Sequence, residues 1–268
     1  RLIPTYKFLI IPIFFFYLLF SFLFNFIFFF LYFLFFLLFF FPFIGGVIGL
    51  LIQSEKTRQL KLFLAFSGAF LISITILNLI PEVYEKVGHK AGYYILAGFF
   101  LQIVLDFFTK GIEHGHLHFQ EFKKGFPYSV FIALSLHAFI EGLGLGGGAF
   151  SESIQNNMVF AIGLHELPAA FALAVVLKSV FSKSNTNYLW IAIYAAMVPL
   201  GMLVGSSLTA YQDILTALIG LVIGVFLHIS TTILFENNES HTYGKYKLVA
   251  IVLGLGVALL AVNFGHVH

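Results

Sequence analysis

Two short stretches, LHAFIEG at residues 136–142 and LHELPA at residues 164–169, are central to the interpretation of this sequence of 268 residues. Each places a histidine and a carboxylate in the middle of a long apolar segment. An ionisable side chain near the centre of a membrane span costs about 2.5–3.5 kcal/mol on insertion scales. Such side chains are expected to face a partner or a water-filled path, so we interpret the two stretches as a functional site.

The composition surrounding these stretches is that of a polytopic membrane protein. Apolar residues make up 60% of the chain and charged residues 10%, whereas soluble domains are about 25% charged. The chain contains no cysteine, which excludes disulfides and thiolate metal ligands. Its ten histidines are the natural nitrogen ligands for zinc and similar metals.

The hydrophobic pattern predicts an all-α bundle of eight spans, each close to the roughly 20 residues that a transmembrane helix needs. The expected spans are Phe29–Ile52, Leu62–Ile80, Ala91–Thr109, Tyr128–Phe150, Met158–Leu177, Tyr188–Ala210, Ile214–Phe235 and Leu248–Gly265. Residues 1–28 form a Phe-rich N-terminal segment. For this segment an extra span, a signal-like segment and non-native upstream sequence all stay open.

The distribution of basic residues predicts the orientation. Ten of the 14 lysines and arginines lie in the loops after the first, third, fifth and seventh spans, and four lie on the other side. By the positive-inside rule, these loops face the cytoplasm and both termini face outward. The longest loop, residues 110–127, carries His114, His116 and His118 and is therefore predicted to be cytoplasmic.

The spacing within the two stretches indicates a metal site. His137 and Glu141 are four residues apart, so one face of a helix presents both. His165 and Glu166 are adjacent and point about 100° apart on an ideal helix. Pro168 clashes with the carbonyl of the residue four positions earlier, which predicts a kink or loosened turn at His165. Such a turn would let both side chains reach a common path.

Small residues surround both stretches and predict close helix packing. Gly142–Gly146 and Gly144–Gly148 have GxxxG spacing, and Ala170–Ala174 is a similar pair of small residues. Small faces let helices approach closely in a membrane. We expect these faces to bring the fourth and fifth spans together.

At these residues the chain resembles the ZIP (Zrt-, Irt-like protein) family of divalent metal transporters. The fourth-span signature His-x-x-x-Glu/Asp-Gly is matched by His137, Glu141 and Gly142, and the fifth-span signature His-Glu-x-Pro by His165, Glu166 and Pro168. The resemblance runs from about Phe29 to the end, which makes residues 29–268 a ZIP-like transport domain.

The resemblance implies a metal site between the fourth and fifth spans. It makes His137, Glu141 and His165 ligands of a primary site, and Glu166 an acidic residue that serves a second metal in the family. Relatives carry ligands for the second metal where this chain has Ala138, Ala169 and Val198. We therefore expect one transported ion.

The loss of a ligand at Ala169 leaves the primary site short of one donor. His228 in the seventh span is the candidate replacement, because a zinc site needs about four nitrogen or oxygen ligands. His228 also forms a polar stripe with Thr232 and Glu236, each four residues apart.

The expected function is transport of Zn²⁺, or of Fe²⁺ or Mn²⁺, towards the cytoplasm. Direction comes from the resemblance alone. We expect no catalytic residues and no resident cofactor, since the metal is the substrate. The expected partners are the metal cation and the lipid bilayer of the plasma or inner membrane, without nucleic acid; a homodimer stays open.

Two other functions compete with this interpretation. A proton or cation channel could use His137 and Glu141 as a relay. An intramembrane metalloprotease with an H-E-x-x-H motif would need a second histidine where this chain has Ala169, on a helix that Pro168 interrupts.

Overall fold

The structure, a computed structural model, describes residues 33–52, 57–109, 111–112, 127–147, 152–181, 185–235 and 241–265. Within these ranges the chain is helical and contains no strand. Eight helical segments are long and apolar enough to cross a membrane, which confirms the predicted fold class. Residues 1–28 and most of the loop 110–127 lie outside the described residues, so their assignments stay predictions.

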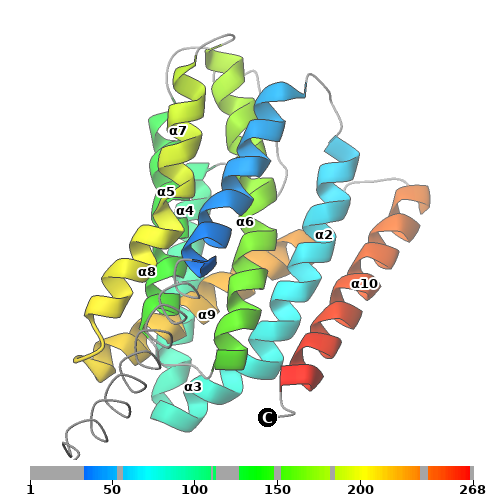
Figure 1. The fold of residues 1–268 in the computed structure, drawn as a ribbon. Coiled ribbons are helices and arrows are strands. Elements are labelled where there is room, and N and C mark those ends of the chain that lie inside the picture. The colour runs from blue at the N-terminus through cyan, green and yellow to red at the C-terminus, as the bar shows by residue number, and fades with distance from the viewer. Residues whose placement is uncertain are drawn as a thin grey trace, which may run out of the picture. The chain divides into compact units, whose positions relative to one another are not determined.

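The helices follow one another along the chain as shown in Figure 1. They are Phe33–Leu51, α2 (Thr57–Ile74), the π-helix η1 (Thr75–Leu79), α3 (Ile80–Val87), α4 (Lys90–Thr109), α5 (Tyr128–Gly146), α6 (Glu152–Val180), α7 (Thr186–Ala195), α8 (Met197–Ser207), α9 (Gln212–Phe235) and α10 (His241–Gly265). The chain divides into two compact units, residues 1–37 and 38–268. The description below concerns the second unit.

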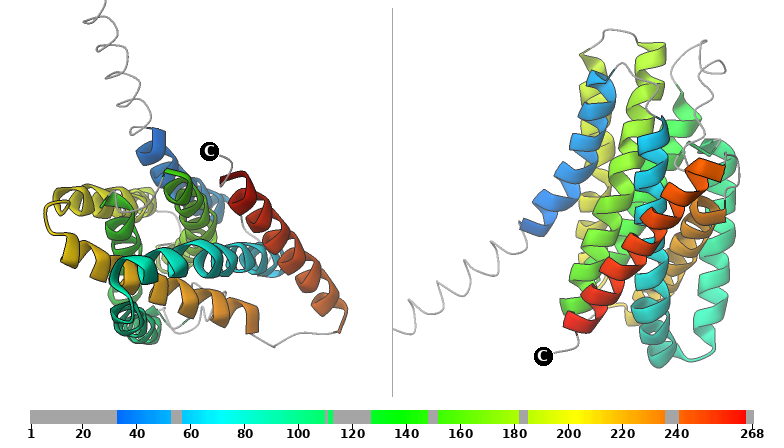
Figure 2. Two further views of the ribbon diagram at one scale, coloured as in Figure 1. Left: turned by 90° about the horizontal axis from the view of Figure 1, so that it is seen from below. Right: turned by 90° about the vertical axis from the view of Figure 1, so that its right-hand side faces the viewer.

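Helix α6 forms the centre of this unit and α10 its edge. The most extensive helix contacts are α5 with α8, α4 with α9 and α10 with α2; Figure 2 shows α10, in red, along the outside of the bundle. In an apolar stretch of 18 residues within α6, 72% of the residues are buried. The corresponding share in the last span is 11%. A buried central helix is a suitable place for polar side chains that must avoid lipid.

Glycines on the first helix let it lie directly against α6. A side-chain carbon at Gly45 would overlap the backbone of Leu167, and one at Gly49 would come within 2.7 Å of the carbonyl oxygen of Phe171. Ala174 of α6 lies at the same contact, so its methyl group faces the first helix. Small residues here allow the close backbone approach expected in membrane bundles.

The glycines of α5 pack against a different neighbour from the one expected. A side-chain carbon at Gly142 or Gly146 would collide with the backbone of α8, and one at Gly144 would meet Val222 of α9. The expectation that these glycines bring the fourth and fifth spans together is therefore wrong for Gly142, Gly144 and Gly146, while Gly148 lies outside the described residues. The reason is angular: Gly142 follows Glu141 by about 100° around the helix, so the two residues face different helices.

Prolines alter two of the expected spans, one at its end and one in its interior. The second span continues past Pro81 to Val87, because Pro81 lies in the first turn of α3, where its missing N–H is tolerated. Just before it, the Ile80 N–H bonds to the carbonyl of Thr75, five residues back, as in a π-helix. The sixth span breaks at Ala196 between α7 and α8, close to Pro199, whose ring would clash with the carbonyl of Ala195.

We predict that Gly201→Ala destabilises the protein by about 1–3 kcal/mol, the usual cost of overpacking. Gly201 lies on α8, and a Cβ there would overlap the carbonyl oxygen of Phe139 on α5. Thermal unfolding of the detergent-solubilised protein measures the effect. Gly256→Ala on α10 is the matched control, since a Cβ there meets nothing within 4 Å. Equal melting temperatures for the two variants would contradict this account of the α5–α8 contact.

Candidate metal site

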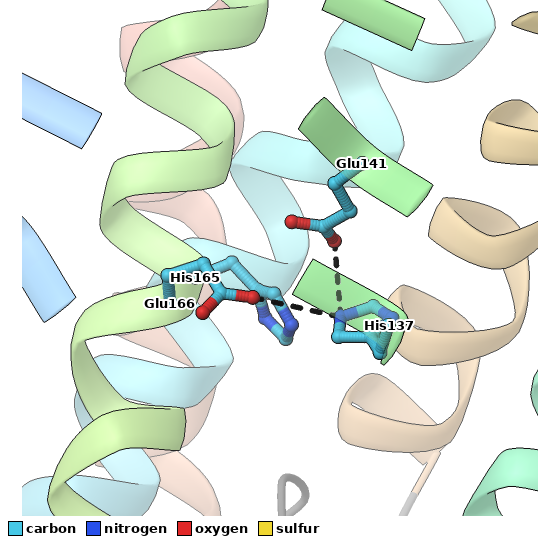
Figure 3. Close-up of side chains that lie close together, drawn as sticks. All are labelled: His137, Glu141, His165 and Glu166. Atoms are coloured by element: carbon cyan, nitrogen blue, oxygen red, sulfur yellow. Dashed lines mark ion pairs between the residues drawn. The ribbon is translucent and has the colours of Figure 1, made fainter. Parts of the chain in front are cut away.

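Four ionisable side chains from α5 and α6 meet inside the bundle. His137 and Glu141 come from α5, His165 and Glu166 from α6, and Figure 3 shows all four turned towards one another. Each is at most 1% exposed. One nitrogen or oxygen atom from each residue lies within 4.8 Å of the other three. The two stretches identified in the sequence therefore do form one cluster.

The imidazole of His137 lies close to both carboxylates of the cluster, as the dashed lines in Figure 3 mark. Its Nε2 lies 3.0 Å from Oε1 of Glu141 and 3.7 Å from Oε1 of Glu166. The ring of His165 stands perpendicular to it, with the ring centroids 5.7 Å apart. The edge of His137 that carries Nε2 therefore faces donors from both helices, as a shared ligand would.

The adjacent residues His165 and Glu166 both reach the cluster, although an ideal helix separates their directions by about 100°. Helix α6 is continuous through Pro168, so the expected loosening at His165 does not interrupt it. The Glu166 side chain has three rotatable bonds, which allow its carboxylate to turn back towards His137. The length of the Glu166 side chain therefore brings its carboxylate to the cluster, without the break in the α6 backbone that was expected.

The charge of the cluster matches a divalent cation. With both carboxylates ionised and both imidazoles neutral, the four side chains carry two negative charges. Buried charge without compensation costs several kcal/mol. Oε2 of Glu141 is buried and makes no hydrogen bond within the described part of the chain. A divalent ion would neutralise the two charges and supply the partner that this oxygen lacks.

The spacing of the donors is somewhat wider than in a closed zinc site. Zinc binds nitrogen and oxygen at about 2.0–2.2 Å, which in a tetrahedron separates the ligand atoms by roughly 3.5 Å. Here the four atoms lie within 4.8 Å of one another. Side-chain movements of about an ångström would close the group around an ion.

Two further side chains contact the cluster, and the sequence interpretation missed both. The Tyr194 hydroxyl of α7 donates a hydrogen bond to Oε2 of Glu166 over 2.5 Å. Nδ1 of His137 lies 3.1 Å from Oε1 of Gln102 on α4. Both Tyr194 and Gln102 are fully buried. The available signal was their position, because an amide or tyrosine in mid-span, away from the membrane interface, needs a polar partner.

His228 lies with a different set of residues. Its Nε2 is 3.3 Å from Oδ2 of Asp106 on α4, and its ring meets the edge of Phe99 at 5.1 Å between centroids. It belongs to α9, the helix that packs along α4, and Glu166 rather than His228 completes the group of four. As a ligand of the primary site, His228 therefore stays a prediction.

Comparison with known proteins agrees with the interpretation of the cluster as a metal site. The profile of the family described as ZIP Zinc transporter matches residues 116–262. Zinc transporter ZIP1 of Takifugu rubripes is 31% identical over 158 residues, which cover 56% of this chain and 50% of that protein. Protein zntD of Dictyostelium discoideum is 29% identical over 168 residues, 56% of this chain and 24% of that protein.

A third relative is similar in length. An uncharacterised protein of Methanocaldococcus jannaschii is 28% identical over 207 residues, covering 72% of this chain and 82% of that protein. The chain thus spans half or less of the two longer relatives. The matched region contains all four residues of the cluster.

We predict that zinc stabilises the purified protein against thermal unfolding. A ligand that binds only the folded state adds about 2.7 kcal/mol at a free concentration of 100 times its Kd. The shift should disappear in His137→Ala and His165→Ala and persist in His89→Ala, whose histidine is exposed between α3 and α4. A shift of equal size in all four proteins would show that zinc binds elsewhere.

Proposed function

Because this chain belongs to the ZIP zinc transporter family, we propose that it carries a divalent metal cation, zinc above all, across a membrane towards the cytoplasm. With eight apolar helical spans it is an integral membrane protein. The observation that carries the proposal is the group of four buried donors from adjacent helices. The metal is the substrate, and the proposal includes no resident cofactor and no catalytic step.

The donor set supports a transport site better than a permanent structural site. A carrier must replace the water around the ion with protein ligands, yet bind weakly enough to release it. Donor atoms spread over 4.8 Å leave room for this compromise. Imidazole and carboxylate without sulfur suit Zn²⁺, Fe²⁺ and Mn²⁺, so the side chains favour this group of metals and zinc follows from the family.

We further propose that one ion is bound at a time. The positions where a second metal would need ligands are Ala138, Ala169 and Val198, and all three side chains are apolar and fully buried. Glu166, the remaining acidic group for a second metal, already accepts a hydrogen bond from Tyr194. One oxygen of Glu166 is thus left for the ion at the primary site.

Zinc uptake into proteoliposomes tests the transport function. We predict that His137→Ala and Glu141→Gln each lower the initial rate of radiolabelled zinc uptake at least tenfold, because each removes a donor from a set of about four. His89→Ala should transport like the wild type. Saturation with zinc concentration is expected for a carrier, whereas flux that rises without saturation would favour the channel alternative. Equal uptake by all variants would refute the site.

We also propose that the protein lies in the plasma or inner membrane with both termini outside. The basis for the orientation is the count of basic residues, ten on the predicted cytoplasmic side and four on the other.

The absence of native cysteine makes this orientation directly testable with single-cysteine variants. In intact cells, a membrane-impermeant maleimide should label His89→Cys and Tyr211→Cys, in the loops after the second and sixth spans. It should label Asn185→Cys, in the loop after the fifth span, only once the membrane is opened. All three positions are exposed in the structure. The opposite labelling pattern would reverse the topology and, with it, the inferred side of release.

A further inference from the structure

We propose that Gln102 is a positioning residue for the metal: its side-chain oxygen holds the proton of His137 on Nδ1, so that Nε2 is free to bind the ion. The inference rests on the proposed function. It concerns a residue outside the four-donor group, on a helix that contributes no ligand to it.

The location of Gln102 argues for a specific role. Helix α4 lies at the periphery, since 22% of the residues in its apolar 18-residue stretch are buried. Phe100 and Val104, two residues before and after Gln102, are 62% and 53% exposed. Gln102 is 0% exposed. An amide therefore occupies one of the few inward positions of a helix that otherwise faces outward, where an apolar residue would pack without needing a polar partner.

The two ring nitrogens of His137 face different neighbours. Oε1 of Gln102 lies 3.1 Å from Nδ1, while Nε2 points to Glu141 and Glu166. A neutral imidazole carries one proton, so one nitrogen donates and the other accepts. An amide oxygen can only accept, so this contact favours the tautomer protonated on Nδ1 once a cation between Nε2 and the carboxylates takes the place of a proton there. That tautomer presents the Nε2 lone pair to the ion and fixes the orientation of the ring.

This arrangement has a known energetic consequence at metal sites. A ligating histidine usually donates its other N–H to a carbonyl or carboxylate, and removal of that partner costs about 10–100-fold in metal affinity. Glutamine is a neutral acceptor, so it orients the ring without adding a third negative charge to the cluster. Such moderate support suits a site that must also release its ion.

The alternative is that Gln102 has only a structural role and holds α4 against α5 by a hydrogen bond, as polar side chains do between membrane helices. The two roles predict opposite effects of Gln102→Met and Gln102→Glu on metal binding. If Gln102 only packs, Gln102→Met should be tolerated because its shape is similar, and Gln102→Glu should do more harm by burying a charge. If Gln102 positions His137, the acceptor matters more, and Gln102→Glu should be the better metal binder.

The experiment measures KM and maximal rate of zinc uptake in proteoliposomes, together with zinc-induced thermal stabilisation. For Gln102→Met we expect KM to rise about 10–100-fold with a maximal rate at or above that of the wild type. For Gln102→Glu we expect KM at or below the wild-type value and a lower maximal rate, because a charge-assisted hydrogen bond makes His137 a stronger ligand. Gln155→Met on α6 is the matched control, since Gln155 bonds the backbone of Leu145 instead.

Several results would overturn the proposal. One is a wild-type KM in Gln102→Met; another is a KM raised more in Gln102→Glu than in Gln102→Met. If Gln102→Met does not fold, Gln102→Glu alone decides, because a raised KM or unchanged maximal rate contradicts the positioning role. Failure of the transport function is distinguishable, since the wild type itself would then show no saturable zinc uptake.

Discussion

The structure depends on the burial of two carboxylates and two imidazoles in an apolar bundle. Glu141 and Glu166 are at most 1% exposed, and two such charges away from water need compensation. Tyr194 donates a hydrogen bond to Glu166, and Nε2 of His137 lies 3.0 Å from Glu141, but neither side chain brings a permanent positive charge. A divalent cation would provide the missing charge, so the burial that makes the cluster costly also suits it to binding an ion.

Close helix packing provides the walls of this site. The first helix lies against α6 through Gly45 and Gly49, and α5 lies against α8 through Gly142 and Gly146. Each contact brings two backbones together and leaves no room for side chains between them. The space between α5 and α6 is different, because it is occupied by the polar side chains themselves. Glycine packing on the outer faces thus leaves the donors on the shared face.

Much of this architecture could be predicted because membrane burial produces a strong pattern. Long apolar runs predicted all eight spans, and the spacing of His137 and Glu141 predicted that they share a face. Contacts that depend on the neighbouring helix were harder to predict from the sequence. The glycines of α5 contact α8 rather than α6, Pro81 begins a new helical segment rather than ending a span, and His228 lies beside Asp106.

The sequence by itself determined the class of protein and included the four residues of the cluster among its predicted ligands, since hydropathy and the identity of ionisable residues do not depend on how helices are arranged. Only the tertiary structure decided which residues support the donors. Gln102 and Tyr194 are far from them along the chain and carry no motif, and their contacts with His137 and Glu166 arise from the packing of α4 against α5 and of α7 against α6. Such contacts depend on helix rotation, which a uniformly apolar sequence leaves undetermined, because nearly every face of these helices is compatible with burial.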